Sequence, residues 1–271
     1  IEIAQFNERL RELILDNASS GFDWSEISPT IFGAVFESTL NPEQRRDGGM
    51  HYTSIENIHK VIDPLFLDDL KNELNEIKQY KQPATIRRRA REFQKKLGSL
   101  KFLDPAAGSG NFLTETYLAL RKLENEALKL YMEDNVRLDV GEDLIQVTLD
   151  QFYGIEINDF AVSVAKTALW IAESQMFEET QSIIYSNMEF LPLKSYTNIV
   201  EGNALEMNWH NIVDKRDLDH IIGNPPFVGA RLMSTKQTHE LKGVFGKLKG
   251  VGNLDYVAGW YGKAAQFIDQ T

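Results

Sequence analysis

The segment Asn224-Pro225-Pro226-Phe227 has residue types that can hold a planar amine. Two consecutive prolines remove two backbone donors and keep the chain extended. The Asn224 amide oxygen and the Pro225 carbonyl can then accept hydrogen bonds from both N–H groups of an exocyclic amine, and Phe227 offers a face for stacking. A proline-stiffened loop explains both prolines but not this order of types. We interpret the segment as a candidate catalytic site for a reaction at the amino group of a flat base.

A second candidate site is the glycine-containing segment 104–112, Asp-Pro-Ala-Ala-Gly-Ser-Gly-Asn-Phe. Glycines allow a tight turn and a close approach of the backbone to a ligand, although a plain turn is the favoured interpretation of the glycine pair taken alone. A dinucleotide fingerprint requires a small residue where Leu113 stands, and an acid about 20 residues further on. A phosphate loop requires a lysine where Asn111 stands. Nicotinamide and triphosphate ligands are therefore disfavoured.

A third candidate is Glu156, within Gly154–Asn158. A carboxylate at the carboxyl end of a strand can accept hydrogen bonds from both hydroxyls of a ribose, and Ile157 can cover one face of an adenine ring. A solvated acid at a strand end is an equally good interpretation of Glu156 taken alone.

The hydrophobic pattern predicts the scaffold that must position these segments. Short apolar runs predict strands at 100–103, 151–157, 198–200 and 219–222, and helical spacing predicts helices at 112–132 and 159–175. Strands that alternate with helices predict an α/β fold with a Rossmann-like, doubly wound parallel sheet. Because the carboxyl ends of parallel strands meet at one edge, the candidate segments should lie close together.

The first 98 residues lack predicted strands and are expected to form an α-helical layer. Predicted helices cover residues 1–16, 31–40, 55–80 with a break at Pro64, and 84–97. Thr53 and Glu56 have the spacing of a capping box at the start of the third helix. A polar, glycine-containing loop is predicted at 45–50.

Composition excludes several classes of protein. The chain has 271 residues, of which 42% are hydrophobic and 25% charged, as in globular proteins. A formal charge of −11 excludes a polyanion-binding surface over the whole molecule, because Lys and Arg supply phosphate contacts. The absence of cysteine excludes disulfides and thiolate zinc sites, and the five histidines show no metal-ligand spacing, so no metal is expected. No apolar run approaches the ~18 residues of a membrane span, and we expect a cytoplasmic protein without membrane contact.

Together the motifs resemble those of S-adenosylmethionine-dependent DNA amino-methyltransferases that modify adenine N6. Segment 104–112 resembles the cofactor loop of that family, segment 224–227 its catalytic motif, and segment 201–205 its adenine-recognition loop. Residues 45–54 resemble the segment that precedes the cofactor loop in the permuted γ order, and 254–256 the motif after the catalytic loop. With 31–36, the chain is similar over 29–271 to the MmeI-like, type IIL restriction–modification family. Ala107 stands where that family often has a cysteine.

The resemblance implies a role for each matching residue. Asp104 would bind the amino-acid end of S-adenosylmethionine, Glu156 its ribose and Asn203 its adenine amine, while Thr53 would bind the methionine carboxylate unless it serves as the helix cap. The implied cofactor-binding residues are Thr53, Asp104, Ala106, Gly108, Gly110, Asn111, Phe112, Glu156, Ile157, Asn203 and Ala204. The implied catalytic residues are Asn224, Pro225, Pro226 and Phe227.

The resemblance also implies the domain organisation and the partners. Residues 1–98 would form a helical region that carries the cofactor-covering segment 45–54. Residues 99–271 would form the catalytic core, which we expect to stop after four of seven strands and before a target-recognition domain. The expected substrate is double-stranded DNA with its target adenine flipped out. Nuclease and target-recognition domains are expected elsewhere on the parent chain.

A glycine-punctuated basic stretch follows the catalytic motif. We predict that it is a mobile loop, poorly ordered without DNA, that contacts phosphates next to the base pocket. Its basic residues are Arg231, Lys236, Lys242, Lys247 and Lys249, against Glu240.

Other functions remain open from the sequence. Protein and RNA amino-methyltransferases also use an Asn-Pro-Pro-aromatic loop, and the geometry that serves adenine N6 also serves cytosine N4. A binding module that keeps the fold without catalysis is a further alternative.

Overall fold

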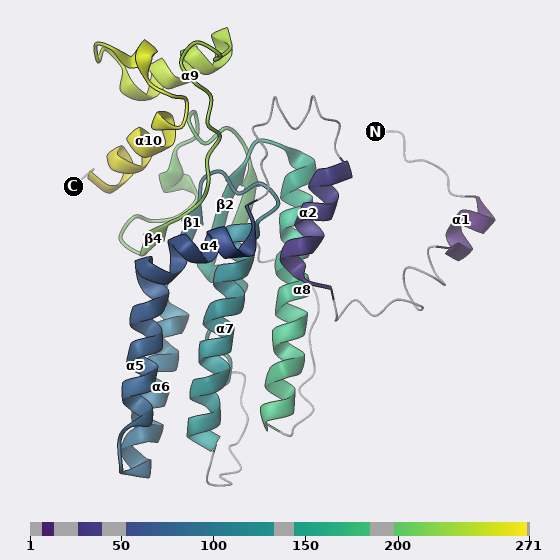
Figure 1. Cartoon of the computed structure of the whole chain (residues 1–271), viewed down its shortest axis with the longest axis vertical. Coiled ribbons are helices and arrows are strands. Elements are labelled where there is room, and N and C mark those ends of the chain that lie inside the picture. The colour runs from purple at the N-terminus through teal and green to yellow at the C-terminus, as the bar shows by residue number, and fades with distance from the viewer. Residues whose placement is uncertain (1–6, 14–26, 40–52, 133–143, 185–197, 270–271) are drawn as a thin grey trace.

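The computed structural model describes residues 7–13, 27–39, 53–132, 144–184 and 198–269 (Figure 1). Its centre is one parallel sheet of four strands in the order β3-β2-β1-β4. Phe102 of β1 pairs with Phe152 of β2 on one side and with His220 of β4 on the other. The four predicted strands are confirmed, with ends that differ by up to two residues. Their bounds are β1 (Phe102–Asp104), β2 (Phe152–Glu156), β3 (Asn198–Glu201) and β4 (His220–Ile221).

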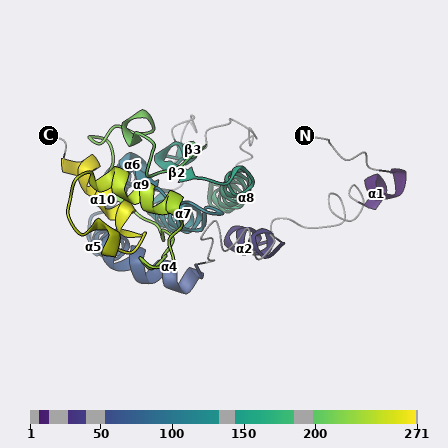
Figure 2. The same cartoon turned by 90° about the horizontal axis from the view of Figure 1, so that it is seen from above.

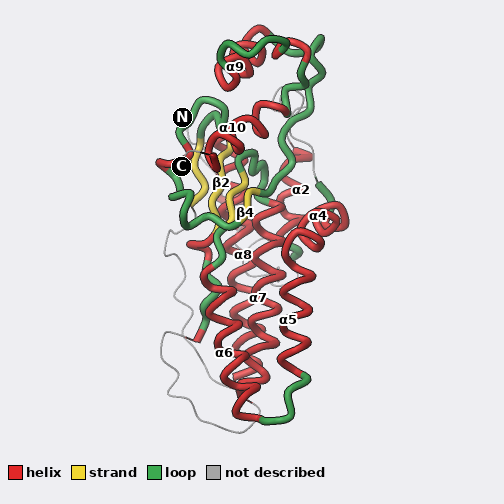
Figure 3. The backbone as a smooth tube through the Cα atoms, turned by 90° about the vertical axis from the view of Figure 1, so that its left-hand side faces the viewer, coloured by secondary structure: helices red, strands yellow, loops and turns green. Residues whose placement is uncertain are grey.

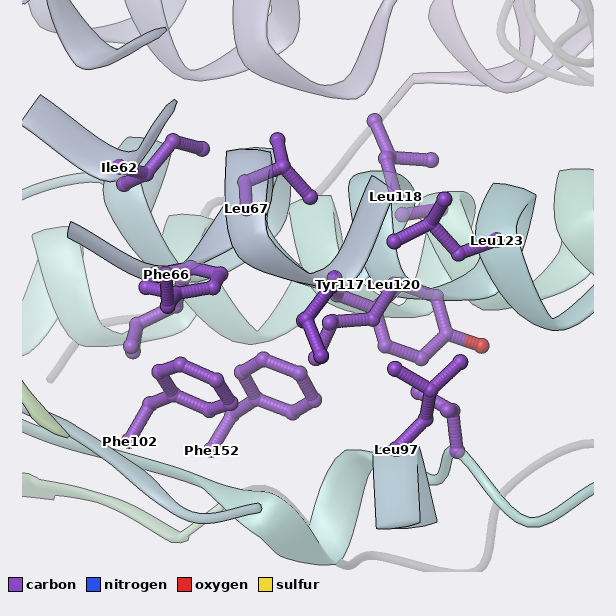
Figure 4. Close-up of a cluster of buried hydrophobic side chains, with 14 of the residues drawn as sticks. Ile62, Phe66, Leu67, Leu97, Phe102, Tyr117, Leu118, Leu120, Leu123 and Phe152 are labelled. Carbon is purple, nitrogen blue, oxygen red and sulfur yellow. The ribbon is translucent and has the colours of Figure 1, made fainter. Parts of the chain in front are cut away.

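Long helices cover one face of the sheet and extend well beyond it (Figures 1 and 3). They are α5 (Asp68–Lys78), α6 (Pro83–Ser99), α7 (Asn111–Met132) and α8 (Asp159–Ile184). Figure 4 shows the core on this face, where the rings of Phe102 and Phe152 stack with centroids 5.5 Å apart. Helix α8 extends past its predicted end at residue 175, because buried Met176, Thr180 and Ile184 continue its inward face.

A second apolar cluster covers the opposite face. Successive residues of a strand point to opposite sides, so Leu103 and Ile155 point away from the long helices. They pack with Trp209, Tyr256 and Trp260. The second layer is visible from above in Figure 2. Helical elements on both faces confirm the predicted doubly wound architecture. The elements of this layer are η6 (Trp209–Asn211), α9 (Thr235–Phe245), η7 (Val251–Asn253) and α10 (Ala258–Asp269).

The N-terminal helical layer is confirmed where the chain is described, as α1 (Glu8–Leu13), α2 (Pro29–Thr39), α4 (Ile55–Ile62) and the π-helical turn η3 (Asp63–Leu67). The predicted break at Pro64 falls within η3. Helix α2 packs against the cofactor-loop end of α7: a methyl group at Gly33 would lie 2.9 Å from Oδ1 of Asn111. The predicted loop at 45–50 lies outside the described residues. None of the helices in the described ranges has the length and apolar character that crossing a membrane requires.

Helix α7 is buried on nearly every side and carries charged groups into the interior. Arg121 and Glu124, each 1% exposed, form an ion pair. Arg121 also donates to Oγ1 of Thr180 at 2.7 Å, and Gln94 donates to Glu124 at 3.0 Å. Each partner supplies hydrogen bonds that offset the loss of water, which is how a buried ion pair becomes tolerable. The remaining short helix, η5 (Leu149–Gln151), leads into β2.

Candidate active site

The candidate site lies where the strand order reverses. From β1 the chain adds β2 and β3 to one side, and then places β4 on the other side of β1. Ligands bind at such a switch point, outside the carboxyl ends of the strands. Asp104 ends β1, and Gly223 follows β4 with φ +149°. A methyl group at Gly223 would lie 2.3 Å from Oδ1 of Asp104, so segment 104–112 and the residue just before Asn224 are in direct contact.

Asp104 is a buried carboxyl group, 1% exposed, whose Oδ1 accepts a hydrogen bond from the Ala106 N–H at 2.9 Å. Burial, and to a lesser extent the nearby charge of Glu156, raises the pKa of Asp104 to about 7. It forms no ion pair with another described residue. A ligand that brings a positive charge to Asp104 would offset this cost of ionisation.

Glu156 connects the cofactor loop to the end of β2. Its Oε2 accepts from the backbone N–H of Gly108 and its Oε1 from that of Asn158, each at 2.9 Å. Gly108 and Gly110 both have positive φ, at 54° and 81°. A methyl group at Gly110 would also lie 2.8 Å from Cβ of Ala165 in α8, so close packing of loop and helix requires this glycine.

Asn203 lies in the turn after β3, near the end of β2. Its Oδ1 accepts from the Leu205 N–H at 3.0 Å, and its Nδ2 donates to Glu240 at 2.7 Å. A carbonyl oxygen has two lone pairs and an amide nitrogen two protons, so Asn203 keeps one of each for a ligand. Ile157 is 50% exposed and presents an apolar side chain at this edge.

Asn224 contacts the end of the segment predicted to cover the cofactor. Its Nδ2 donates to Oγ1 of Thr53 at 3.2 Å. The capping-box prediction for Thr53 is wrong, because Ser54 is the N-cap residue of α4 and accepts from the Asn57 N–H. Thr53 is therefore available to the site. The contact turns the amide nitrogen of Asn224 toward Thr53 and leaves its oxygen for another partner.

The segment after Phe227 is fixed to the residues just before α10. The Val228 N–H donates to Oδ1 of Asp255 at 3.1 Å, and the Tyr256 N–H donates to the Val228 carbonyl at 3.0 Å. Between these anchors and Gly223 the motif lies at the surface, with Phe227 65% exposed. An aromatic face is thus available beside the Asn224 amide.

Comparison with known proteins identifies the family. The family model for the DNA-methyltransferase domain of MmeI matches residues 77–271. The chain belongs to this family.

Two of its relatives cover nearly the whole chain. The type IIL restriction–modification enzyme MmeI, solved in complex with DNA, superposes with a TM-score of 0.87 and 42% identity, over 98% of this chain and 34% of that one. DNA methyltransferase A of Bacillus subtilis (strain 168) is 37% identical over 98% of this chain and 30% of its own length. A putative type II restriction enzyme and methyltransferase of Methanocaldococcus jannaschii is 28% identical over 75% of this chain and 18% of its own. The chain thus spans about a third or less of these relatives.

In this MmeI-type domain the loop prediction for the basic stretch is wrong at Lys236 and Lys242, which lie on a helix, whereas Arg231, Lys247 and Lys249 lie in turns outside it. Residues Thr235–Phe245 form helix α9, which begins with a capping box of Ser234 and Gln237. Lys236 lies 3.8 Å from Glu240, and the other basic residues of the stretch form no ion pair with described residues. All five predicted DNA-contact residues are exposed. Of the glycines that suggested a loop, Gly243 lies within α9 and Gly246 ends the helix with φ +59°.

Several residues predicted from the cofactor motifs point elsewhere. The Phe112 ring lies in the first apolar cluster and Ala204 in the second, so any contact of theirs with a ligand would use the backbone. Asn111 is directed at Gly33. Sequence reasoning missed Glu240 and assigned Asp255 no contact. The Leu-Asp-Tyr motif at 254–256 was the available signal for Asp255, whereas nothing in the spacing of Glu240 indicated burial.

Proposed function

We propose that this domain transfers a methyl group from S-adenosylmethionine to adenine N6 of a flipped-out DNA base, as part of a restriction–modification protein. The observation that carries the proposal is that the segment of Asp104 and the segment of Asn224 lie in contact. Gly223 lies against Asp104, and the next residue, Asn224, donates to Thr53. A group held at Asp104 and a base held at Asn224 would therefore be neighbours.

The chemistry of the donor set fits this cofactor. S-Adenosylmethionine carries a positive sulfonium and an ammonium group, and it supplies an electrophilic methyl group when bound. Asp104 offers a buried carboxylate that needs a positive partner, and Glu156 offers oxygens at the end of β2. Asn203 and Ile157 would hold and cover the adenine end, and Thr53 would reach the methionine carboxylate through its hydroxyl proton.

The catalytic motif would prepare the target amine. An exocyclic amine conjugated with its ring is a poor nucleophile. Hydrogen bonds from its two N–H groups to Oδ1 of Asn224 and to the Pro225 carbonyl would draw the nitrogen toward tetrahedral geometry and free its lone pair. Thr53 fixes the Asn224 amide so that its oxygen is presented. Positioning and exclusion of water supply most of the acceleration in such a transfer. Stacking on Phe227 would offset part of the unstacking cost of a few kcal/mol.

The experiment is a tritium-transfer assay of the full-length protein on unmethylated genomic DNA, followed by digestion to nucleosides. We expect label in N6-methyl-2′-deoxyadenosine. Label in N4-methyl-2′-deoxycytidine would show that cytosine is the target base, and label only in added release-factor protein would contradict DNA methylation.

A variant pair tests the role of the motif. Asn224→Ala should lower methylation at least about 100-fold, because it removes an acceptor that acts on the reacting amine, while binding of S-adenosylhomocysteine persists. Asn211→Ala is the control, since Asn211 is an exposed asparagine of η6. Normal methylation by Asn224→Ala would refute the assigned role.

A further inference from the structure

The buried carboxylate of Glu240 joins three segments around the candidate site. Its side chain is 3% exposed, although it belongs to the surface helix α9. Oε1 accepts from Nδ2 of Asn203 at 2.7 Å, and Oε2 accepts from the Tyr256 hydroxyl. Lys236, one turn earlier on α9, lies 3.8 Å from Oε1. A single side chain thus connects segment 201–205, the residues just before α10 and helix α9.

Each partner of Glu240 leads to a different part of the site. The Asn203 amide is held at both ends, because its Oδ1 accepts from the Leu205 N–H and its Nδ2 donates to Glu240. The bond to Glu240 therefore helps to fix the orientation of the amide. The Tyr256 ring meets Trp260 edge-on, with centroids 5.0 Å apart, and the Trp260 indole donates to the Pro105 carbonyl of the cofactor loop at 2.9 Å. A displacement of Glu240 would therefore shift both the Asn203 amide and the segment around Pro105, on two sides of the proposed cofactor site.

We propose that Glu240 is a positioning residue for cofactor binding, which holds the Asn203 amide toward the adenine end and fixes α9 against it. This role rests on the proposed function. Replacement by alanine would leave two buried donors without an acceptor, and both would move to regain one. Replacement by glutamine keeps the bond from Asn203, which the amide oxygen can accept, and replaces the other by a bond of opposite direction, in which the amide nitrogen donates to the Tyr256 hydroxyl oxygen.

The test compares Glu240→Ala, Glu240→Gln and the control Glu206→Ala, an exposed acid in the same turn as Asn203. Calorimetry measures the Kd of S-adenosylhomocysteine, and methyl transfer to unmethylated genomic DNA gives kcat and the KM for S-adenosylmethionine. Glu240→Ala should raise Kd and KM about tenfold, as expected for one misdirected hydrogen bond. Its kcat should stay within about threefold, because the bond serves ground and transition states equally. The glutamine and control variants should stay within about twofold of wild type.

Two results would overturn the proposal: a folded Glu240→Ala protein with the wild-type Kd, or a Glu240→Gln protein as weak as Glu240→Ala. If circular dichroism shows that Glu240→Ala does not fold, Tyr256→Phe decides. It keeps the ring but removes one donor, and should raise Kd about threefold; an unchanged Kd would overturn the proposal. A wild-type protein that neither binds S-adenosylhomocysteine nor methylates DNA would refute the proposed function, and this inference with it.

Discussion

Replacing Asp104 by asparagine should stabilise the cofactor-free protein relative to wild type. This gain in the free energy of unfolding should be larger at neutral pH than at acidic pH. The pKa of Asp104 is about 7 in the folded protein against an ordinary 3.8, because burial disfavours its charge. Between these values the folded state holds a proton that the unfolded chain has released, so wild-type stability falls as pH rises. At 1.36 kcal/mol per pH unit the loss totals about 4 kcal/mol, of which about 2.3 kcal/mol falls between pH 5 and 7, since the group is half ionised at pH 7.

Urea unfolding measures this difference at pH 5, 6, 7 and 8, with tryptophan fluorescence as the signal. The stability of Asp104→Asn minus that of wild type should grow from pH 5 to about 7 and then level off. Asp214→Asn is the control: the hydrogen-bonded Arg216 guanidinium lowers the pKa of this exposed carboxyl group, the opposite direction. Parallel pH profiles for Asp104→Asn and wild type would show that Asp104 is ionised throughout, and the reasoning would be refuted.

Two further variant pairs separate architecture from chemistry. Gly223→Ala should abolish cofactor binding, because its methyl group would lie 2.3 Å from a carboxylate oxygen, whereas Gly229→Ala, with no atom within 4 Å, should bind normally in calorimetry. Thr53→Val should lower kcat about tenfold at unchanged melting temperature, because the Asn224 amide loses its anchor. Ser54→Ala, which removes the α4 cap, should cost about 1 kcal/mol in unfolding experiments at unchanged kcat. Equal effects within either pair would contradict the assigned roles.

The strands and their ends were predictable because a parallel sheet leaves a local signal. Each strand is a short apolar run, and each candidate segment begins where such a run stops, as at Asp104 and Asn224. The order of the strands was not predicted, because the right-handedness of crossovers does not determine on which side of the sheet β4 pairs with β1. Once the carboxyl ends share an edge, the proximity of Asp104 and Gly223 follows from the switch point between β1 and β4.

Contacts between distant segments were not predictable. Thr53 and Glu56 have the spacing of a capping box, but Ser54 also fits the cap, and sequence spacing cannot tell which of two adjacent hydroxyls faces Asn224 across the fold. Arg121 and Glu124 have the spacing of a solvated ion pair on a helix surface, yet both are buried, because α6 and α8 cover α7 on opposite sides. Tertiary packing determines which side chains are buried and which distant segments they contact, and the sequence of a single helix does not show this packing.

The net charge of −11 does not describe the surface around the candidate site. Five of the acids in the described part of the chain are buried, against one basic residue, Arg121. These acids are Asp104, Glu115, Glu124, Glu156 and Glu240. Asp104 and Glu156 are buried at the ends of β1 and β2, and the other three accept hydrogen bonds from buried or partly buried side chains, so none of the five adds a negative charge to the surface. On α9 the effect is direct: Glu240 turns inward to Asn203 while Lys236 and Lys242 stay exposed. An acidic chain can in this way present lysines on one helix at its surface.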